Sequence, residues 1–401
     1  MAVQALSDIK VLDLTWYISG PYCTRLLADY GADVIKVEKP TEGDPARKLG
    51  PFLRDDPHPE KSGLFLNLNI NKRGITLNLK SEWGSKVIKE LVKDTDILVE
   101  NFSPGVMEKL GLDYDTLKTI NPGLVMTSIS NYGQTGPYRG FKATELVLFA
   151  MGSAMYSHGI PEFEPLKYAL TVLQFQAGGS VAAATLGAYY GAKYKGVGQY
   201  LDVSIMETAM GNVDTRMTEC MAYQYSGRIN TRQPFGGGFA VGIYTCTDGY
   251  IDIAAGASNL PRLVEMVNDD RLRDPKYADP AAAFQPELKE EFDEVWLGWL
   301  STHSKKEVVE ACLKHNVWIS PVQTAADVVE DPHFNERGLF VEVQHPVMGN
   351  VKIAGRPFLM EKTPWQLRRP APLIGQHNEE VYTGLGYSKE ELVVLRQQGI
   401  I

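Results

Sequence analysis

Short β-rich runs alternate with helical patterns over the first 130 residues, and this alternation limits the possible folds more than any other feature of the chain. Runs rich in branched aliphatic residues predict strands at 10–14, 34–37, 97–100 and 124–130. Apolar residues spaced along one helical face predict helices from Pro21 to Gly31, over 82–93 and, after a Ser388/Glu391 capping box, near the C-terminus. Strands that alternate with helices pair in parallel, so we expect an α/β fold with a Rossmann-like sheet.

The sequence changes character after residue 227. Residues 228–238 are polar and glycine-rich, as expected of a linker. Turn residues at 247–249 and 348–350 lie between β-rich runs and predict two hairpins, and helical patterns occupy 258–315. A smaller α+β domain is therefore expected beyond the linker.

One uncharged stretch, 168–192, has 25 residues and is long enough to span a bilayer. It contains glutamines and four glycines, and alanine rather than leucine supplies most of its apolar character, so a buried helix fits it better. The N-terminus lacks a signal-peptide pattern, and the four cysteines are too widely spaced to favour a disulfide framework. We expect a cytoplasmic protein without a membrane span.

The charge balance restricts the possible partners. The chain has 40 basic and 49 acidic residues, a net charge of −9, which argues against a nucleic-acid or anionic-membrane partner but allows a local basic pocket. Cations and amides gather near predicted strand ends, where parallel sheets bind ligands, and together they favour phosphate binding. The cations and amides are Lys36, Lys39, Asn71, Lys72, Arg73, Asn101, Lys109 and Lys142. Phe102 directly follows Asn101 and is included with them.

Other site chemistries have weaker signals. The first turn holds one glycine, Gly20, instead of the three of a dinucleotide fingerprint, so Glu38 after the second strand is little support for NAD binding. The seven histidines show no metal-binding spacing, and we expect no metal site. Gly236, Gly237 and Gly238 form either a flexible lid over a reactive intermediate or a plain linker, and their spacing does not decide between the two.

Several longer motifs follow one another along almost the whole chain. They read DLTWYISGPYCTRLLADYGADVIKVEKPTEGDPAR, NLNINKRGITLNLKS, DILVENFSPGVMEKLGLDYDTL, GQYLDVSIMETAM and APLIGQHNEEVYTGLGYSKEELVVLRQQGII. On these motifs the sequence resembles the family III CoA-transferases, the group that includes formyl-CoA transferase, carnitine CoA-transferase-like proteins and the α-methylacyl-CoA racemases.

The resemblance implies a large α/β domain built from both chain ends, a smaller α+β domain and an interlocked dimer. We therefore expect 1–227 to form the N-terminal part of the large domain, 228–335 the linker and small domain, and 336–401 a return segment that completes the large domain. Coenzyme A or an acyl-CoA would bind between the domains as a substrate, with no permanently bound cofactor.

The resemblance also assigns roles by position. It implies that CoA is contacted by Lys39 near the adenosine, by Asn71, Lys72 and Arg73 beside the phosphates, by Asn101 and Phe102 of the ENF motif, and by Lys109. Lys142 joins these candidates as a cation of the strand-end cluster. Gly236 to Gly238 resemble a mobile glycine loop, and Ile18 replaces a glutamine of formyl-CoA transferase. Glu145 matches a glutamate close to the reacting centre.

The chain departs from the family at the nucleophile. Family members carry an aspartate 25 residues before the glutamine of a GxGQ turn, which here ends at Gln199, and that position is Gln174. The transferase mechanism needs a carboxylate that attacks a thioester, forms a mixed anhydride and then holds CoA as an aspartyl thioester. The uncharged carboxamide of Gln174 cannot perform this attack, and Glu145 is a weak substitute for it.

We therefore expect a non-nucleophilic subunit of a heteromeric CoA-transferase that acts with a homologous, aspartate-bearing subunit. The resemblance includes such enzymes of anaerobic aromatic degradation, among them succinyl-CoA:benzylsuccinate CoA-transferase. The expected substrates are an acyl-CoA such as succinyl-CoA and a carboxylic acid such as an aromatic succinate. Two alternatives stay open: an active homodimeric CoA-transferase or racemase with altered chemistry, and a non-enzymatic CoA-binding protein.

Overall fold

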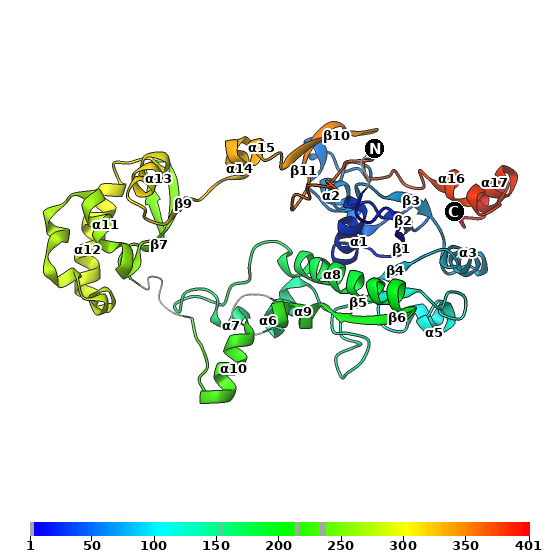
Figure 1. The fold of residues 1–401 in the computed structure, drawn as a ribbon, viewed down its shortest axis with the longest axis horizontal. Helices are drawn as coiled ribbons and strands as arrows, with labels where there is room; N and C mark the ends of the chain where they lie inside the picture. Colours follow the sequence, from blue (N-terminus) through cyan, green and yellow to red (C-terminus); the bar gives the residue numbers. More distant parts are fainter. Residues whose placement is uncertain (1–3, 153, 213–215, 233–237) are drawn as a thin grey trace. The chain divides into compact units, whose positions relative to one another are not determined.

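The computed structural model describes residues 4–152, 154–212, 216–232 and 238–401. These form two compact units (Figure 1). The first unit comprises Met1–His158, Pro165–Thr231 and Gly338–Ile401, and the second comprises Gly159–Glu164 and Arg232–Arg337. Segments from both ends of the chain thus belong to the first unit.

Six parallel strands form the central sheet of the first unit, in the order β3-β2-β1-β4-β5-β6. They are β1 (Lys10–Asp13), β2 (Asp33–Glu38), β3 (Arg73–Thr76), β4 (Ile97–Glu100), β5 (Val125–Ser130) and β6 (Gln199–Ser204). The strand order reverses between β1 and β4. In a sheet of this kind, ligands bind outside the carboxyl ends of the strands at the point of reversal.

Helices cover both faces of this sheet (Figure 1). The helices of the first unit are α1 (Ser19–Asp29), α2 (Gly63–Asn69), α3 (Glu82–Val92), α4 (Val106–Lys109), α5 (Tyr114–Leu117), α6 (Glu145–Met151), α7 (Ala154–Ser157), α8 (Val172–Lys195), α9 (Ile205–Asn212), α10 (Arg216–Ser226), α16 (Asn378–Gly384) and α17 (Lys389–Gln397). Val11 of β1 faces a core shared with α1 and α8, whereas Leu12 faces the opposite core, shared with α3, α16 and α17. Strands buried on both faces are typical of parallel sheets.

The C-terminal segment is tied to the N-terminal half of the chain by side-chain hydrogen bonds. Arg368 donates to the carbonyls of Ala28, Gly31 and Ala32 at the end of α1, with N···O distances of 2.6–3.2 Å. Tyr382 of α16 donates to the carbonyl of Thr76 at 2.7 Å. A hairpin of β10 (Phe340–His345) and β11 (Gly349–Ala354) precedes this segment. The tail therefore covers the edge of the sheet at β3.

The second unit is a small α+β structure. Its antiparallel sheet has the order β7-β8-β9, formed by Val241–Cys246, Gly249–Ala254 and Ile319–Pro321. Its helices are α11 (Gly256–Val267), α12 (Pro286–Leu300), α13 (Lys305–Lys314), α14 (Ala325–Glu330) and α15 (Pro332–Glu336). Trp296 and Phe292 of α12 lie at the centre of its apolar core.

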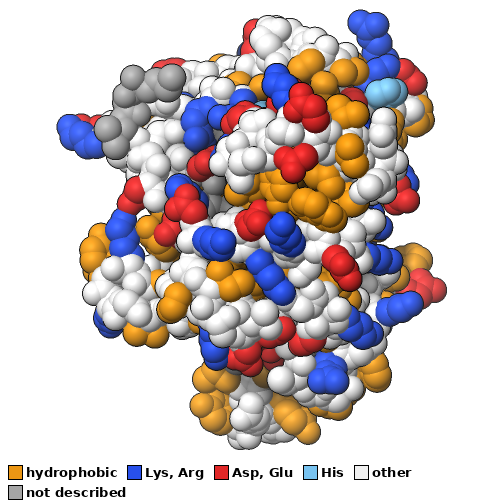
Figure 2. All heavy atoms as spheres, turned by 90° about the vertical axis from the view of Figure 1, so that its right-hand side faces the viewer, with side chains coloured by type: hydrophobic (Ala, Val, Ile, Leu, Met, Phe, Trp, Pro, Cys, Tyr) orange, Lys and Arg blue, Asp and Glu red, His pale blue; other side chains and the backbone are white. Residues whose placement is uncertain are grey.

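The face seen in Figure 2 mixes charges of both signs. Lysine and arginine side chains lie among aspartates and glutamates over the described part of this face. Such a face does not produce the single-sign field that attracts polyanions.

The α/β fold with a Rossmann-like large domain and a smaller α+β domain is confirmed. Two sequence expectations are corrected. Strands β3 and β6 were not expected, because their sequences, RGIT and QYLDVS, are short or largely polar. The uncharged helix, α8, is buried only on one face, and it runs on to two lysines at its C-terminal end. Among the helices that the structure describes, none is both long and apolar enough to cross a membrane.

Candidate active site

Two loops meet at the carboxyl ends of β1 and β4. Asn101, which follows β4, accepts a hydrogen bond from the Trp16 N–H at 2.8 Å and donates one to the Trp16 carbonyl at 2.7 Å. The rings of Trp16 and Phe102 lie edge to face with centroids 5.2 Å apart. Lys39, which follows β2, places its ammonium 4.5 Å from the Trp16 ring centre. We call Trp16, Phe102 and Lys39 the strand-end platform.

Buried charges beneath the platform hold the loop after β1. The Lys36 ammonium donates to the Thr15 carbonyl at 2.8 Å and pairs with Asp44 at 2.8 Å. Asp44 also accepts from the Tyr17 N–H at 3.1 Å, and Tyr17 has a φ of 65°. A non-glycine residue in this left-handed region needs support from its surroundings, which the bond to Asp44 provides.

Asp13, the last residue of β1, pairs with Lys72 at 3.0 Å. Burial alone would raise the pKa of Asp13, but the ammonium groups of Lys72 and Lys36 bring it below its usual range. Burial lowers the pKa of Lys72 to about 8, against the attraction of Asp13. Asp13 therefore stays ionised and accepts from the Thr15 N–H at 2.9 Å.

Helices α1 and α8 cross closely beside this loop. A Cβ added at Gly178 of α8 would lie 2.5 Å from the Ser19 carbonyl at the start of α1. Only a glycine permits such an approach of two backbones. One turn earlier, Phe175 packs edge to face on Tyr22 of α1, with centroids 5.0 Å apart. The first turn of α8, which includes the half-buried Gln174, therefore lies against the start of α1.

Glu145 adjoins the same turn of α8. Its carboxylate accepts a hydrogen bond from the Leu173 N–H at 2.7 Å. Its second oxygen is buried and has no hydrogen-bond partner in the described part of the chain. Burial raises the pKa of Glu145, while the N–H groups of Leu173 and Gln174 oppose the shift. The arrangement puts a carboxyl group that readily holds a proton next to the backbone of Gln174.

The residues of the NKR stretch all have partners within the protein. Asn71 and Lys72 precede β3, which starts at Arg73 and runs parallel to β2, and the ammonium of Lys72 reaches Asp13 at the carboxyl end of β1. Asn71 donates to Asp29, and Arg73 pairs with Asp33 and Glu380. The ammonium of Lys72 is fully buried and donates to Asp13, Pro21 and Asn69. A phosphate contact from Lys72 would require it to leave these partners.

The remaining predicted residues are placed as follows. Lys109 ends α4 and Lys142 precedes α6, and both are exposed and without an ion pair to any described residue. Gly236 and Gly237 lie outside the described residues, and Gly238 is buried next to Val241. Ile18 is buried immediately before α1.

Comparison with known proteins identifies the family. The sequence profile of "CoA-transferase family III" matches residues 6–378. The chain belongs to this family. It is 34% identical to a formyl-CoA:oxalate CoA-transferase of Streptomyces coelicolor over the full length of both chains. It is 31% identical to a succinyl-CoA–D-citramalate CoA-transferase of Chloroflexus aurantiacus, covering 99% of this chain and 98% of the relative.

A solved structure agrees with this result. A CaiB/BaiF family protein from Brucella suis superposes with a TM-score of 0.84 at 27% identity, covering 95% of this chain and 99% of that one. The protein is thus a CoA-transferase by family and fold, and its family implies CoA thioesters as substrates.

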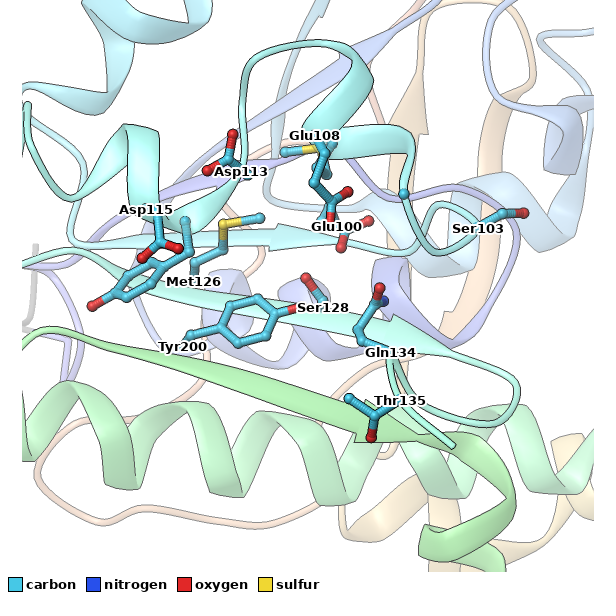
Figure 3. Close-up of a pocket in the computed structure, with 13 residues that line it drawn as sticks. Glu100, Ser103, Glu108, Asp113, Asp115, Met126, Ser128, Gln134, Thr135 and Tyr200 are labelled. Carbon is cyan, nitrogen blue, oxygen red and sulfur yellow. The ribbon is translucent and has the colours of Figure 1, made fainter. Parts of the chain in front are cut away.

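A pocket of this CoA-transferase fold lies beside the strand-end platform, and sequence reasoning missed it. It has a volume of about 390 Å³ and is lined by residues of β4, β5 and β6 and of the segment 103–115 (Figure 3). Glu100, Ser128 and Tyr200 lie next to one another on its sheet side (Figure 3). Burial raises the pKa of Glu100 to about 7. The signal for Glu100 was an acid at the end of an otherwise apolar strand, ILVE.

Proposed function

We propose that this chain is the non-nucleophilic subunit of a heteromeric family III CoA-transferase and acts with a homologous subunit that bears the aspartate. The proposal is carried by Gln174, which lies in the first turn of α8 beside Glu145, at the position where the family resemblance puts the nucleophilic aspartate. The family's covalent route needs a carboxylate that becomes an anhydride and then a thioester. A carboxamide nitrogen or oxygen in its place is a poor nucleophile, because its lone pair is delocalised.

Glu145 is not a good replacement for the missing aspartate. One of its oxygens already accepts the Leu173 N–H at 2.7 Å, and the other is buried with no hydrogen-bond partner among the described residues. Glu145 is therefore better suited to orient the first turn of α8, next to Gln174, than to attack a thioester.

Large apolar side chains that solvent reaches support an obligate partner. Leu170 before α8 is 84% exposed, Tyr194 of α8 is 66% exposed and Tyr225 of α10 is 80% exposed. These side chains lie at separate places, at the two ends of α8 and on α10. A homologous subunit, interlocked with this one as the family resemblance implies, is the partner that we propose to cover them.

The proposed reaction moves CoA from succinyl-CoA to an aromatic succinate. The citramalate-specific relative uses succinyl-CoA by its name, which supports the donor. The edge-to-face pair of Tyr22 and Phe175 lies one turn from Gly178 and beside Gln174, and aromatic side chains favour an aromatic acyl group. CoA would bind at the strand-end platform, with Lys109 and Lys142 contacting its phosphates through their unpaired ammonium groups.

The decisive experiment restores the nucleophile. The purified parent chain should transfer no CoA and form no covalent intermediate with succinyl-CoA. Gln174→Asp should produce a CoA adduct that hydroxylamine cleaves, detected by mass spectrometry. Gln176→Asp, a carboxylate two residues along the same helix, is the matched control and should give none. Turnover by the parent chain at ordinary enzyme rates would establish the homodimeric alternative instead.

A further inference from the structure

Glu100 is the last residue of β4 and connects the pocket of Figure 3 with the strand-end platform. Its side chain is only 2% exposed. One carboxylate oxygen accepts a hydrogen bond from the Phe102 N–H at 2.7 Å. On the adjacent strand, Ser128 is its paired residue, and the Ser128 hydroxyl favours the ionised carboxylate.

The turn that Glu100 holds determines where the platform lies. Asn101, in the middle of this turn, makes both of its hydrogen bonds to the backbone of Trp16. Phe102, at its end, supplies the ring that packs against Trp16. A change in the bond between Glu100 and Phe102 would therefore move two contacts of Trp16 together.

The surroundings of Glu100 are unfavourable for a negative charge. Burial is the largest cause of its raised pKa, and the carboxylates of Glu108 on α4 and Asp202 on β6 add to it. Tyr200 on β6 presents a neutral phenol, whose own pKa is raised to about 12 by burial. Asp113, Asp115 and Tyr114 of the α5 segment line the same pocket, and none of the described lysines and arginines is among its lining residues. The carboxyl group thus gains or loses its proton near neutral pH.

We infer that Glu100 is a proton-controlled positioning residue: its ionised form fixes the Asn101–Phe102 turn and the Trp16 platform for acyl-CoA, and protonation loosens them. A charge-assisted hydrogen bond to the Phe102 N–H is stronger than the bond to a neutral carboxyl group. The inference rests on the proposed CoA site only where it concerns the binding of acyl-CoA. The response of Trp16 to protonation is a property of the ligand-free chain.

The test follows Trp16 directly. The full chain is labelled with 5-fluorotryptophan, the Trp16 resonance is assigned with Trp16→Phe, and the fluorine spectrum is recorded from about pH 5.5 to about pH 8.5. The Trp16 resonance should shift with a midpoint near 7, because burial raises the pKa of Glu100 to about 7. In Glu100→Gln this shift should be absent. In Glu108→Gln, the matched control, it should remain with a lower midpoint, because one like charge has been removed.

Ser128→Ala keeps the test decisive if Glu100→Gln does not fold. It removes a hydroxyl that favours the ionised form, so the midpoint should rise. A Trp16 resonance that does not titrate in the parent chain, or that titrates equally in Glu100→Gln, overturns the inference.

CoA binding provides the second readout. If only the ionised form binds, the affinity for CoA by titration calorimetry should fall about tenfold at one pH unit below the midpoint. Glu100→Gln should bind weakly at every pH, without this dependence. If the chain binds no CoA at any pH while Trp16 still titrates, the proposed CoA site fails and the role of Glu100 at Trp16 stands. If CoA binds with equal affinity across the range, the link from Glu100 to binding is wrong.

Discussion

Buried charges at the carboxyl end of β1 show how single residues shape this site. Lys36 and Lys72 were expected to hold phosphates, and both instead hold the loop that leads to α1, through the Thr15 carbonyl and Asp13 respectively. Sequence could not reveal this, because a lysine beside a strand looks the same whether its ammonium points into the sheet or into solvent. Isolated burial of such a charge is costly, so each has a carboxylate partner.

Lys72→Met should therefore destabilise the protein rather than merely weaken ligand binding. It leaves Asp13 buried and without its closest cation, and losing one partner of a buried pair costs about 3–5 kcal/mol. Urea unfolding of the variant would measure this. Lys109→Met, at an exposed lysine, should change stability by less than about 0.5 kcal/mol. Equal stability of the two variants would contradict the structural role of Lys72.

Glu100 should make stability depend on pH. Its pKa is raised from 4.5 to about 7 in the folded chain, so between these values the native state holds a proton that the unfolded state has lost. The stability that this bound proton gives the native state is therefore fully present at acid pH, below 4.5, and is lost as the pH rises through about 7. Glu100→Gln does not titrate, so its stability relative to the parent should increase from about pH 5 to about pH 8, by at most about 3 kcal/mol. Urea unfolding at both pH values tests this, and a constant difference would contradict it.

At the scale of secondary structure, the crossing of α1 and α8 fixes the position of Gln174. The two helices touch at Gly178, where the Ser19 carbonyl leaves no room for a side chain. A methyl group there must push the first turn of α8 away from α1, and overpacking of this kind typically costs about 1–3 kcal/mol.

Gly178→Ala should accordingly lower the unfolding temperature of the chain. Gly179→Ala is the matched control, because a Cβ at the next residue meets nothing within 4 Å. That change should stabilise the helix by up to about 1 kcal/mol through the higher helix propensity of alanine. Thermal unfolding followed by circular dichroism distinguishes the two, and a stabilised Gly178→Ala would show that the helices do not meet as described.

Periodicity predicted the elements that form the centre of the sheet, but not its edges. β1, β2, β4 and β5 are apolar on both faces, and the capping box at Ser388 and Glu391 has the geometry that its sequence pattern indicates. β6 has mostly exposed side chains, so it lacks the apolar signal. Nor could sequence alone show which of the predicted site residues share the carboxyl ends of the strands. That depends on where each strand begins and on how far a side chain reaches: Asn101 follows β4, whereas Lys72 precedes β3 and still extends its ammonium to Asp13 at the carboxyl end of β1.

At the scale of the whole molecule, the proposed hetero-oligomer explains both the exposed apolar side chains and the presence of Gln174 where the family resemblance puts an aspartate. An interlocked subunit contributes packing that its partner cannot replace, so it can be retained after its own nucleophile is lost. The rings of Tyr190 and Tyr194 of α8 pack against each other at an angle of 44°, with centroids 4.6 Å apart, and both side chains are exposed. Burial of such a pair in an interface would remove a large apolar area from water.

We therefore expect this chain and its aspartate-bearing homologue to form a hetero-oligomer when they are co-expressed, with both present in equal amounts by native mass spectrometry. Tyr194→Glu should weaken the assembly, because it would bury an unpaired charge, whereas Lys352→Glu on β11 changes a charge on a different element and serves as the control.

The complex should also be asymmetric in chemistry. Replacing the partner's aspartate should reduce transfer by several orders of magnitude, since a covalent nucleophile is lost, while Gln174→Ala should leave most of the activity. A stable homodimer of this chain with full activity would contradict both expectations, because it would need neither the partner's surface nor the partner's carboxylate.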